Sequence, residues 1–303
     1  MNQRARIMCA VDLSWRSEGA FNYAVAMAKA RRVPLDVLFA VSHRHPLGWR
    51  VRERVAQLAD LRRRVSEAGV DMTLTVQDGK PAEVILQHAA SSAGSPGLIV
   101  LGAPNRGGFA RLRLRSVAQA VVHQTDRPTL IVPGSDSVES SASVPFRRVL
   151  VAIDFSPASM SALDEAYRII RQDGATMRLL HVVDIAQPPV PRLTFEFPIV
   201  DYTELLRKDA TRRLRRLLPL SQELHGRVHV HVAVGLVFDQ IVRNANEMDA
   251  DLVVLGVTKR GVLGRLLGST TGYALGRVGR PVLAVPARRD ESLADHNLDT
   301  IAA

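Results

Sequence analysis

The segment from Gly256 to Thr270 combines glycines, basic residues and hydroxyl groups as phosphate-binding loops do. Its four glycines let a backbone come close to a ligand, and Lys259 lies among its basic residues. Ser269 precedes an expected helix whose free N–H groups would attract an anion. The Gly-Lys-Ser/Thr triplet of a Walker A loop is absent. The segment predicts a phosphate site; ordinary turns with Ser269 as a helix cap are the alternative.

A related segment in the first half of the chain, from Gly102 to Ser116, keeps the basic character and the final serine. Asn105 lies three residues into it, and Arg115 occupies the position of the last glycine. The Arg115 side chain would crowd a phosphate held by the backbone unless its guanidinium itself binds the phosphate. We therefore expect anion binding mainly in the second half.

The two segments belong to an internal repeat that spans the chain. Val11-Asp12-Leu13-Ser14 returns 142 residues later as Ile153-Asp154-Phe155-Ser156, and the helix after it keeps its apolar positions at the same offset. Later matches have offsets of 153 to 156, which places a net insertion in the second copy. At 303 residues, the chain has the length of about two domains. We predict domains at residues 1–134 and 147–287, a Ser-rich linker at 135–146 and a tail at 288–303.

Each copy contains five apolar runs that alternate with helical patterns, which predicts parallel strands joined by crossover helices. The expected fold is two tandem doubly wound, Rossmann-like α/β domains, each with a five-stranded, mostly parallel sheet. The expected strands are Ile7 to Asp12, Leu35 to Val41, Met72 to Val76, Leu98 to Gly102, Thr129 to Val132, Val149 to Asp154, Met177 to Val183, Val228 to Val234, Leu252 to Gly256 and Val282 to Val285.

In such sheets a ligand binds beyond the carboxyl ends of the strands, where the strand order reverses. Asp12 and Asp154 follow the first strand of each copy and are the carboxylates nearest to the expected phosphates. Ending a strand and turning into a helix is an equally good role for them. The two loops themselves contain no carboxylate that could act as a general base. We expect a regulatory protein rather than an enzyme, with at most slow ATPase activity.

The order of these motifs resembles the universal stress protein family, twice along the chain. The features that carry the resemblance are a strand ending in Asp, a second strand ending Leu-His-Val, a glycine after the third strand and the glycine-rich basic loop. In the second copy the resemblance implies Asp154 and Val182 at the adenosine end of a nucleotide. Its phosphates would contact Gly256, Gly268, Ser269 and Thr270, with Lys259 at the family's second glycine. The first-copy counterparts are Asp12, Ala40, Gly102, Asn105 and Ser116.

The resemblance implies a cytoplasmic stress-response regulator that binds an adenine nucleotide, ATP with or without Mg²⁺, mainly in the second domain. It also implies that the sheet-edge strands Thr129 to Val132 and Val282 to Val285 lie at domain and dimer interfaces, with a homo-oligomer (dimer) formed through such edges. The alternative is a nucleotide-free interaction scaffold of the same fold. A third hypothesis is polyanion binding through the formal net charge of +10.

Other residues carry weaker signals. Cys9 is the only cysteine, which excludes an intramolecular disulfide and fits a reduced compartment. The first apolar run is too short for a secretory signal. His229 and His231 share one face of a strand but have no third partner at metal-binding spacing, so we expect no metal. The helices containing Arg62 to Arg64 and Arg212 to Arg216 are interpreted as solvated amphipathic helices rather than nucleic-acid sites, and no membrane partner is expected.

Overall fold

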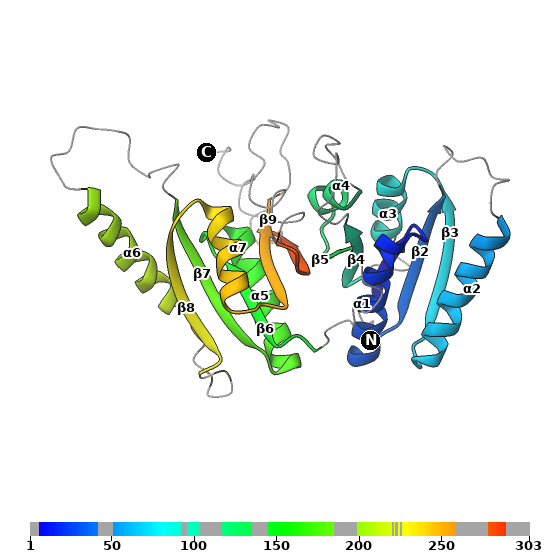
Figure 1. Ribbon diagram of the computed structural model, residues 1–303, viewed down its shortest axis with the longest axis horizontal. Coiled ribbons are helices and arrows are strands. Elements are labelled where there is room, and N and C mark those ends of the chain that lie inside the picture. Colours follow the sequence, from blue (N-terminus) through cyan, green and yellow to red (C-terminus); the bar gives the residue numbers. More distant parts are fainter. Residues whose placement is uncertain are drawn as a thin grey trace, which may run out of the picture.

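The computed structural model describes residues 6–41, 51–91, 96–103, 117–134, 145–184, 199–219, 221, 224, 226–258 and 278–288. Strands and helices alternate along both halves (Figure 1). The first half contains β1 (Ile7–Val11), α1 (Trp15–Arg31), β2 (Leu35–Val41), α2 (Val51–Glu67), β3 (Met72–Asp78), α3 (Pro81–Ala90), β4 (Leu98–Ala103), α4 (Val117–Gln124) and β5 (Thr129–Pro133). The second contains β6 (Arg148–Ala152), α5 (Pro157–Asp173), β7 (Thr176–Asp184), α6 (Ile199–Arg215), β8 (Val228–Gly235), α7 (Val237–Glu247), β9 (Leu252–Val257) and β10 (Val282–Pro286).

All ten expected strands are present, with both ends within two residues of the predicted positions. Within each half the strand order is that of a doubly wound sheet, β3-β2-β1-β4-β5 and β8-β7-β6-β9-β10, and neighbouring strands are parallel. The order reverses between β1 and β4 in the first half and between β6 and β9 in the second. The predicted fold class, two tandem Rossmann-like domains, is therefore confirmed.

The two halves are joined edge to edge into one ten-stranded sheet. Strands β5 and β10 pair antiparallel, with Leu130 opposite Leu283. These are the strands for which the sequence predicted pairing at a domain or dimer interface. In this chain β5 and β10 pair with each other. An association of two copies would therefore have to use another surface. The outer edges of the sheet are β3 and β8, and β8 carries His229 and His231.

One apolar core runs through both halves on the sheet face covered by α1, α2, α5 and α6. Separate cores lie on the opposite face, under α3 and α4 in the first half and under α7 in the second. The continuous core includes Phe146, which is fully buried and stacks on Tyr23 of α1 with ring centroids 6.2 Å apart. The Phe146 N–H donates a hydrogen bond of 2.9 Å to Oδ2 of Asp173 at the end of α5. The last residue of the predicted linker is thus a packing residue.

Helix α5 shows why these helices begin and end where they do. Ser156 caps its N-terminus by accepting a hydrogen bond from the Ser159 N–H, and Pro157 occupies the first turn. Gly174 ends the helix in the left-handed conformation, φ 71°, with its N–H bonded to the carbonyl of Ile170. Across the described part of the chain, no helix has the length and apolar character to span a membrane.

Candidate functional site

The first strand of each half ends in the same Asp-x-Ser turn. Oδ1 of Asp154 accepts hydrogen bonds from the N–H of Ser156 at 2.9 Å and from its hydroxyl at 2.5 Å. Oδ1 of Asp12 accepts the same pair from Ser14, at 2.9 and 2.6 Å. The middle residues, Leu13 and Phe155, have φ of 59° and 63°. Both carboxylates therefore have the turn-forming role that the sequence left open, and they stabilise a backbone conformation that L-residues rarely adopt.

The hydrogen bonds keep Asp154 ionised. Burial by itself would raise the pKa of this carboxyl, but hydrogen bonds from the hydroxyl and N–H of Ser156, together with those of Ser159 and the Asp154 backbone, lower it below the ordinary value. The side chain nevertheless lies at the surface. Asp154 is thus a charged hydrogen-bond acceptor whose orientation is fixed by Ser156. It lies where the strand order reverses in the second half.

The strand register brings three of the predicted site residues to one edge of the sheet. Ala152 of β6 pairs with Leu180 of β7 and with Leu255 of β9. Asp154, Val182 and Gly256 each follow these positions by one or two residues, so they cluster where the strand order reverses. In the first half, Ala10 pairs with Leu38 and Leu101, which places Asp12, Ala40 and Gly102 in the equivalent cluster.

Gly256 is explained by packing before any ligand is considered. A β-carbon at this position would lie 2.4 Å from the carbonyl carbon of Ala158 and from the backbone nitrogen of Ser159. Both atoms belong to the first turn of α5, so the glycine allows this helix to approach the end of β9. The same contact brings the N-terminal turn of α5, the positive end of its helix dipole, close to the switch point.

A stack of three side chains beside Asp154 was not anticipated from the sequence. The guanidinium of Arg213, on α6, lies 3.7 Å from the ring centroid of Phe155, whose other neighbour is the His181 ring at 4.9 Å. Nδ1 of His181 lies 2.7 Å from the carbonyl oxygen of Ile153. Burial lowers the pKa of His181; the Ile153 carbonyl opposes this shift and Arg213 adds to it. The available signal was a histidine within the apolar run from Leu179 to Val183.

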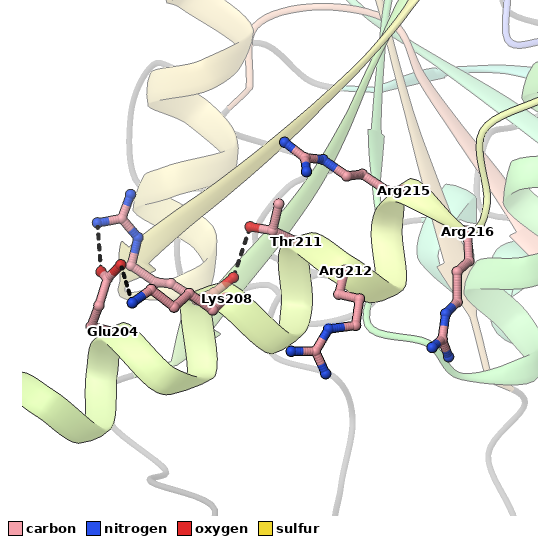
Figure 2. Close-up of a pocket in the computed structure, with 7 residues that line it drawn as sticks. Glu204, Lys208, Thr211, Arg212, Arg215 and Arg216 are labelled. Carbon is pink, nitrogen blue, oxygen red and sulfur yellow. Dashed lines mark hydrogen bonds and ion pairs between the residues drawn. The ribbon is translucent and has the colours of Figure 1, made fainter.

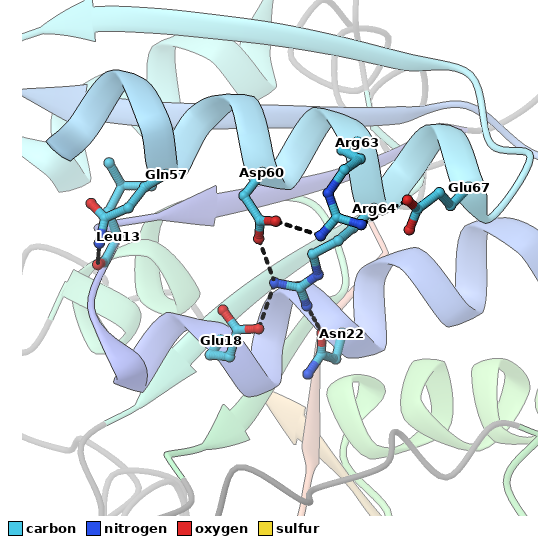
Figure 3. A network of polar contacts seen from close by, with 8 residues as sticks. All are labelled: Leu13, Glu18, Asn22, Gln57, Asp60, Arg63, Arg64 and Glu67. Carbon is cyan, nitrogen blue, oxygen red and sulfur yellow. Dashed lines mark hydrogen bonds and ion pairs between the residues drawn. The ribbon is translucent and has the colours of Figure 1, made fainter. Parts of the chain in front are cut away.

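The first half has an apolar version of this stack. Phe39 occupies the position of His181, with the guanidinium of Arg54 lying 6.0 Å from its ring centroid. Leu13 takes the place of Phe155, and its carbonyl accepts a hydrogen bond of 3.4 Å from Nε2 of Gln57 (Figure 3). The two copies therefore share the turn and the strand positions but differ in the polarity of the residues around them.

Six of the predicted site residues cannot be compared with the structure in the same way. They come from the two glycine-rich basic segments and lie outside the described residues, and they are Asn105, Ser116, Lys259, Gly268, Ser269 and Thr270. The described part of the candidate site is therefore the strand-end cluster and the stack. The assignment of these six residues of the glycine-rich segments to phosphate binding stays a sequence prediction.

Two arginines of α2, Arg63 and Arg64, are engaged in polar contacts within the fold, as Figure 3 shows. Arg64 contacts Oε1 of Glu18 at 2.6 Å and also binds Asn22 of α1, while its guanidinium lies 4.9 Å from the ring centroid of Phe21. Arg63 donates to Asp60 and to Glu67, each at 2.6 Å. The Arg64 contacts tie α2 to α1, the Arg63 pairs lie within α2, and both support the interpretation of this helix as a solvated amphipathic one.

Within the described ranges, no three His, Cys, Asp or Glu side chains lie together as a metal site would require. His229 and His231 are both exposed on β8. Burial, followed by the charge of Arg178, lowers the pKa of His231, while Glu247 acts against these effects. Cys9 is fully buried, and burial raises the pKa of its thiol to about 12, so it packs as an apolar side chain.

Comparison with known proteins agrees with the fold and the repeat. The profile of the universal stress protein family matches twice, at residues 3–133 and 145–286. A universal stress protein of Mycolicibacterium smegmatis is 24% identical over 297 residues, covering 93% of this chain and 97% of its own length. Universal stress protein Rv2005c of Mycobacterium tuberculosis is 26% identical over 294 residues, covering 91% of this chain and 95% of its own.

A solved structure extends the agreement to three dimensions. A universal stress protein from Archaeoglobus fulgidus covers 94% of this chain and 100% of its own, with a TM-score of 0.68 at 21% sequence identity. The likeness at this identity concerns the fold. Together with the two profile matches, the strand order of each half and the shared Asp-x-Ser turns, it shows that the chain belongs to the universal stress protein family as a tandem, two-domain member.

Proposed function

We propose that this chain is a stress-response regulator that binds an adenine nucleotide, ATP, in its second half. The observation that carries the proposal is the clustering of Asp154, Val182 and Gly256 at the reversal of strand order between β6 and β9. Doubly wound sheets bind their ligands at this place. The ionised Asp154 offers an acceptor for a hydroxyl or amino group, and the first turn of α5 brings the positive end of a helix dipole to the same place.

The two halves are not equivalent as nucleotide sites. Both keep the aspartate turn, but the first half has Arg115 where the second has Gly268. A glycine lets the backbone donate directly to a phosphate, whereas an arginine side chain occupies that space. The polar stack of Phe155, His181 and Arg213 also lies beside the second site alone. These differences favour one bound nucleotide per chain.

The test is titration calorimetry of the full chain with ATP, comparing two matched substitutions. Asp154→Asn keeps the turn, because the amide oxygen still accepts from Ser156, but removes the charge. We expect it to weaken ATP binding by about tenfold, as for loss of one charge-assisted hydrogen bond. Asp12→Asn makes the same change in the first half and is expected to leave the affinity within about twofold.

A second pair of substitutions tests the glycine-rich segment. Gly268→Arg gives the second half the residue of the first, and we expect it to abolish binding. Arg115→Gly makes the reverse change and is expected to create a second, weaker site. Failure to bind at millimolar ATP, or equal effects of the two aspartate changes, would refute the proposed site. Purified chain free of any carried nucleotide by mass spectrometry, together with that failure, would favour the nucleotide-free scaffold.

A further inference from the structure

The outward face of α6 carries a continuous row of positive charge. A shallow groove of about 550 Å³ follows this face, lined by Glu204, Arg207, Lys208, Thr211, Arg212, Arg215 and Arg216 (Figure 2). These residues recur in steps of three and four, so they share one side of the helix. Ala210 and Leu214, on the opposite side, are buried against the sheet. The helix is therefore fixed to the domain by its apolar side and presents its cations to solvent.

The charges of this row are poorly neutralised by the protein. Arg207 and Lys208 lie 3.7 and 3.9 Å from the carboxylate of Glu204, and Arg212 lies 3.6 Å from Asp209, all beyond hydrogen-bond distance. Among described carboxylates, none pairs with Arg215 or Arg216. Figure 2 shows Arg215 extending from one side of the row and Arg212 and Arg216 from the other, so that the three guanidinium groups flank the groove.

The corresponding helix of the first half shows that this is a particular feature of α6. On α2, Arg63 makes two ion pairs of 2.6 Å and Arg64 is held by Glu18 and Asn22. The two helices have similar compositions and the same place in the repeat, but their arginines make different contacts. On α2, Arg63 and Arg64 bind other residues of the protein, whereas the cations on the outward face of α6 stay available to an external anion.

We propose that the outward face of α6, defined by Arg207, Lys208, Arg212, Arg215 and Arg216, docks the phosphate backbone of double-stranded DNA without regard to sequence. From Arg207 to Arg216 the row is about 14 Å long, at 1.5 Å per residue. It therefore matches a line of several phosphates rather than a single anion. Arginine and lysine are the residues that contact nucleic-acid phosphates, and phosphate contacts carry no sequence information.

Two further observations favour a duplex over other polyanions. None of the described residues that line the groove is aromatic, and Tyr202 of α6 precedes them in the helix, so the groove lining offers no platform for stacking the bases of a single strand. An interfacial membrane helix needs an exposed apolar side, but the apolar side of α6 is buried and Leu205 is its one exposed large hydrophobic residue among those described. A rigid polyphosphate backbone fits this face better than a lipid surface.

The test is binding of the full chain to a fluorescent random-sequence DNA duplex, by anisotropy, between about 50 and 200 mM salt. The triple variant Arg212→Gln/Arg215→Gln/Arg216→Gln is compared with Arg52→Gln/Arg62→Gln/Arg63→Gln on α2. Both variants lose three positive charges from exposed side chains. Each phosphate contact contributes about −0.9 to the slope of log affinity against log salt. We expect the slope of log affinity against log salt to become shallower by about 2 to 3 in the α6 variant, and its affinity at low salt to fall by at least about tenfold. The affinity of the α2 variant should change by less than about threefold.

Several results would overturn the proposal. They are no duplex binding by the unmodified chain, binding that does not weaken with salt, or equal losses in the two variants, which would reflect net charge alone. Binding to phosphatidylserine vesicles that depends on α6, without duplex binding, would assign the face to a membrane instead. Thermal unfolding of both variants serves as the folding control, because the substituted side chains are exposed.

Discussion

Leu130 and Leu283 lie opposite each other in the β5–β10 ladder, and each is the counterpart of the other in the repeat. Pro128 and Pro281 show the correspondence, because the same offset of 153 residues relates them. The pair therefore marks the centre of an approximate two-fold relation between the halves. Both leucines are buried and both belong to the core that runs through the two halves.

Truncating this pair should show strong coupling. We expect Leu130→Ala and Leu283→Ala each to lower the free energy of unfolding by about 2–5 kcal/mol, because each leaves a cavity in the core. The double variant should lose less than the sum by at least about 0.5 kcal/mol, since cross-strand neighbours share one cavity. Urea denaturation measures both quantities. Leu35→Ala, on β2, combined with Leu283→Ala is the distant control, which should be additive.

The two halves should unfold together. The sheet is continuous across β5 and β10, and the Tyr23–Phe146 contact extends the same core across the junction. Calorimetry of the full chain is therefore expected to give one cooperative transition, with equal calorimetric and van't Hoff enthalpies. Replacement of Leu130 by Asp should split it in two, because a charge cannot be buried at the junction without a partner. Two separate transitions in the unmodified chain would contradict this expectation.

Gly256 and Gly19 should respond in opposite ways to a methyl group. Gly256→Ala is expected to cost at least about 2 kcal/mol of unfolding free energy, because its β-carbon would lie 2.4 Å from the backbone of α5. Gly19 lies in α1, where a β-carbon would come no closer than 3.6 Å to its neighbours. Gly19→Ala should be neutral or stabilising by up to about 1 kcal/mol, through helix propensity. Thermal denaturation without nucleotide distinguishes packing from ligand binding at Gly256.

His181 should make stability depend on pH near neutrality. Burial lowers its pKa in the folded chain, so the unfolded chain binds the proton more readily, with a pKa near 6.5. The free energy of unfolding should therefore fall as the pH drops below about 6.5 and stay constant above it.

The substitution His181→Phe, which copies Phe39 of the first half, should remove this part of the pH dependence. It should also cost about 1 kcal/mol at pH 8, through loss of the hydrogen bond to Ile153. His229→Phe, at an exposed site, is the control. The remaining slope should come in part from His231, whose pKa is also lowered. An unchanged pH profile in His181→Phe would show that the imidazole is not the group responsible.

The sequence predicted the fold well because the repeat and the apolar runs are local signals. The strands buried on both faces, such as β9, read as continuous hydrophobic runs, and their ends were correct within two residues. The strand-end positions of Asp154, Val182 and Gly256 follow from that fold. What the sequence did not reveal depends on contacts between distant residues. Arg213 reaches Phe155 from another helix, and no spacing in the sequence encodes that contact.

The same limit explains the different outcomes for β5, β10 and Gly256. An apolar edge strand indicates that something must cover it, but not whether the cover comes from the same chain or another one. A glycine after a strand fits both a phosphate and a closely packed helix, and the 2.4 Å distance to Ala158 shows that packing by itself requires a glycine at position 256. Sequence patterns thus indicate where contacts are needed, while the fold decides which atoms supply them.

The antiparallel β5–β10 junction has a consequence for how such a chain can evolve. In a symmetric pair of identical chains, every substitution appears twice, once in each subunit. Here the two sides of the β5–β10 junction are encoded by different parts of one chain. Ile131 on β5 and Ala284 on β10 occupy equivalent positions of the repeat but differ in residue type. A mutation can therefore change one half while the other preserves the ancestral chemistry. The tandem arrangement therefore allows the two halves to take different roles, which two identical chains cannot do.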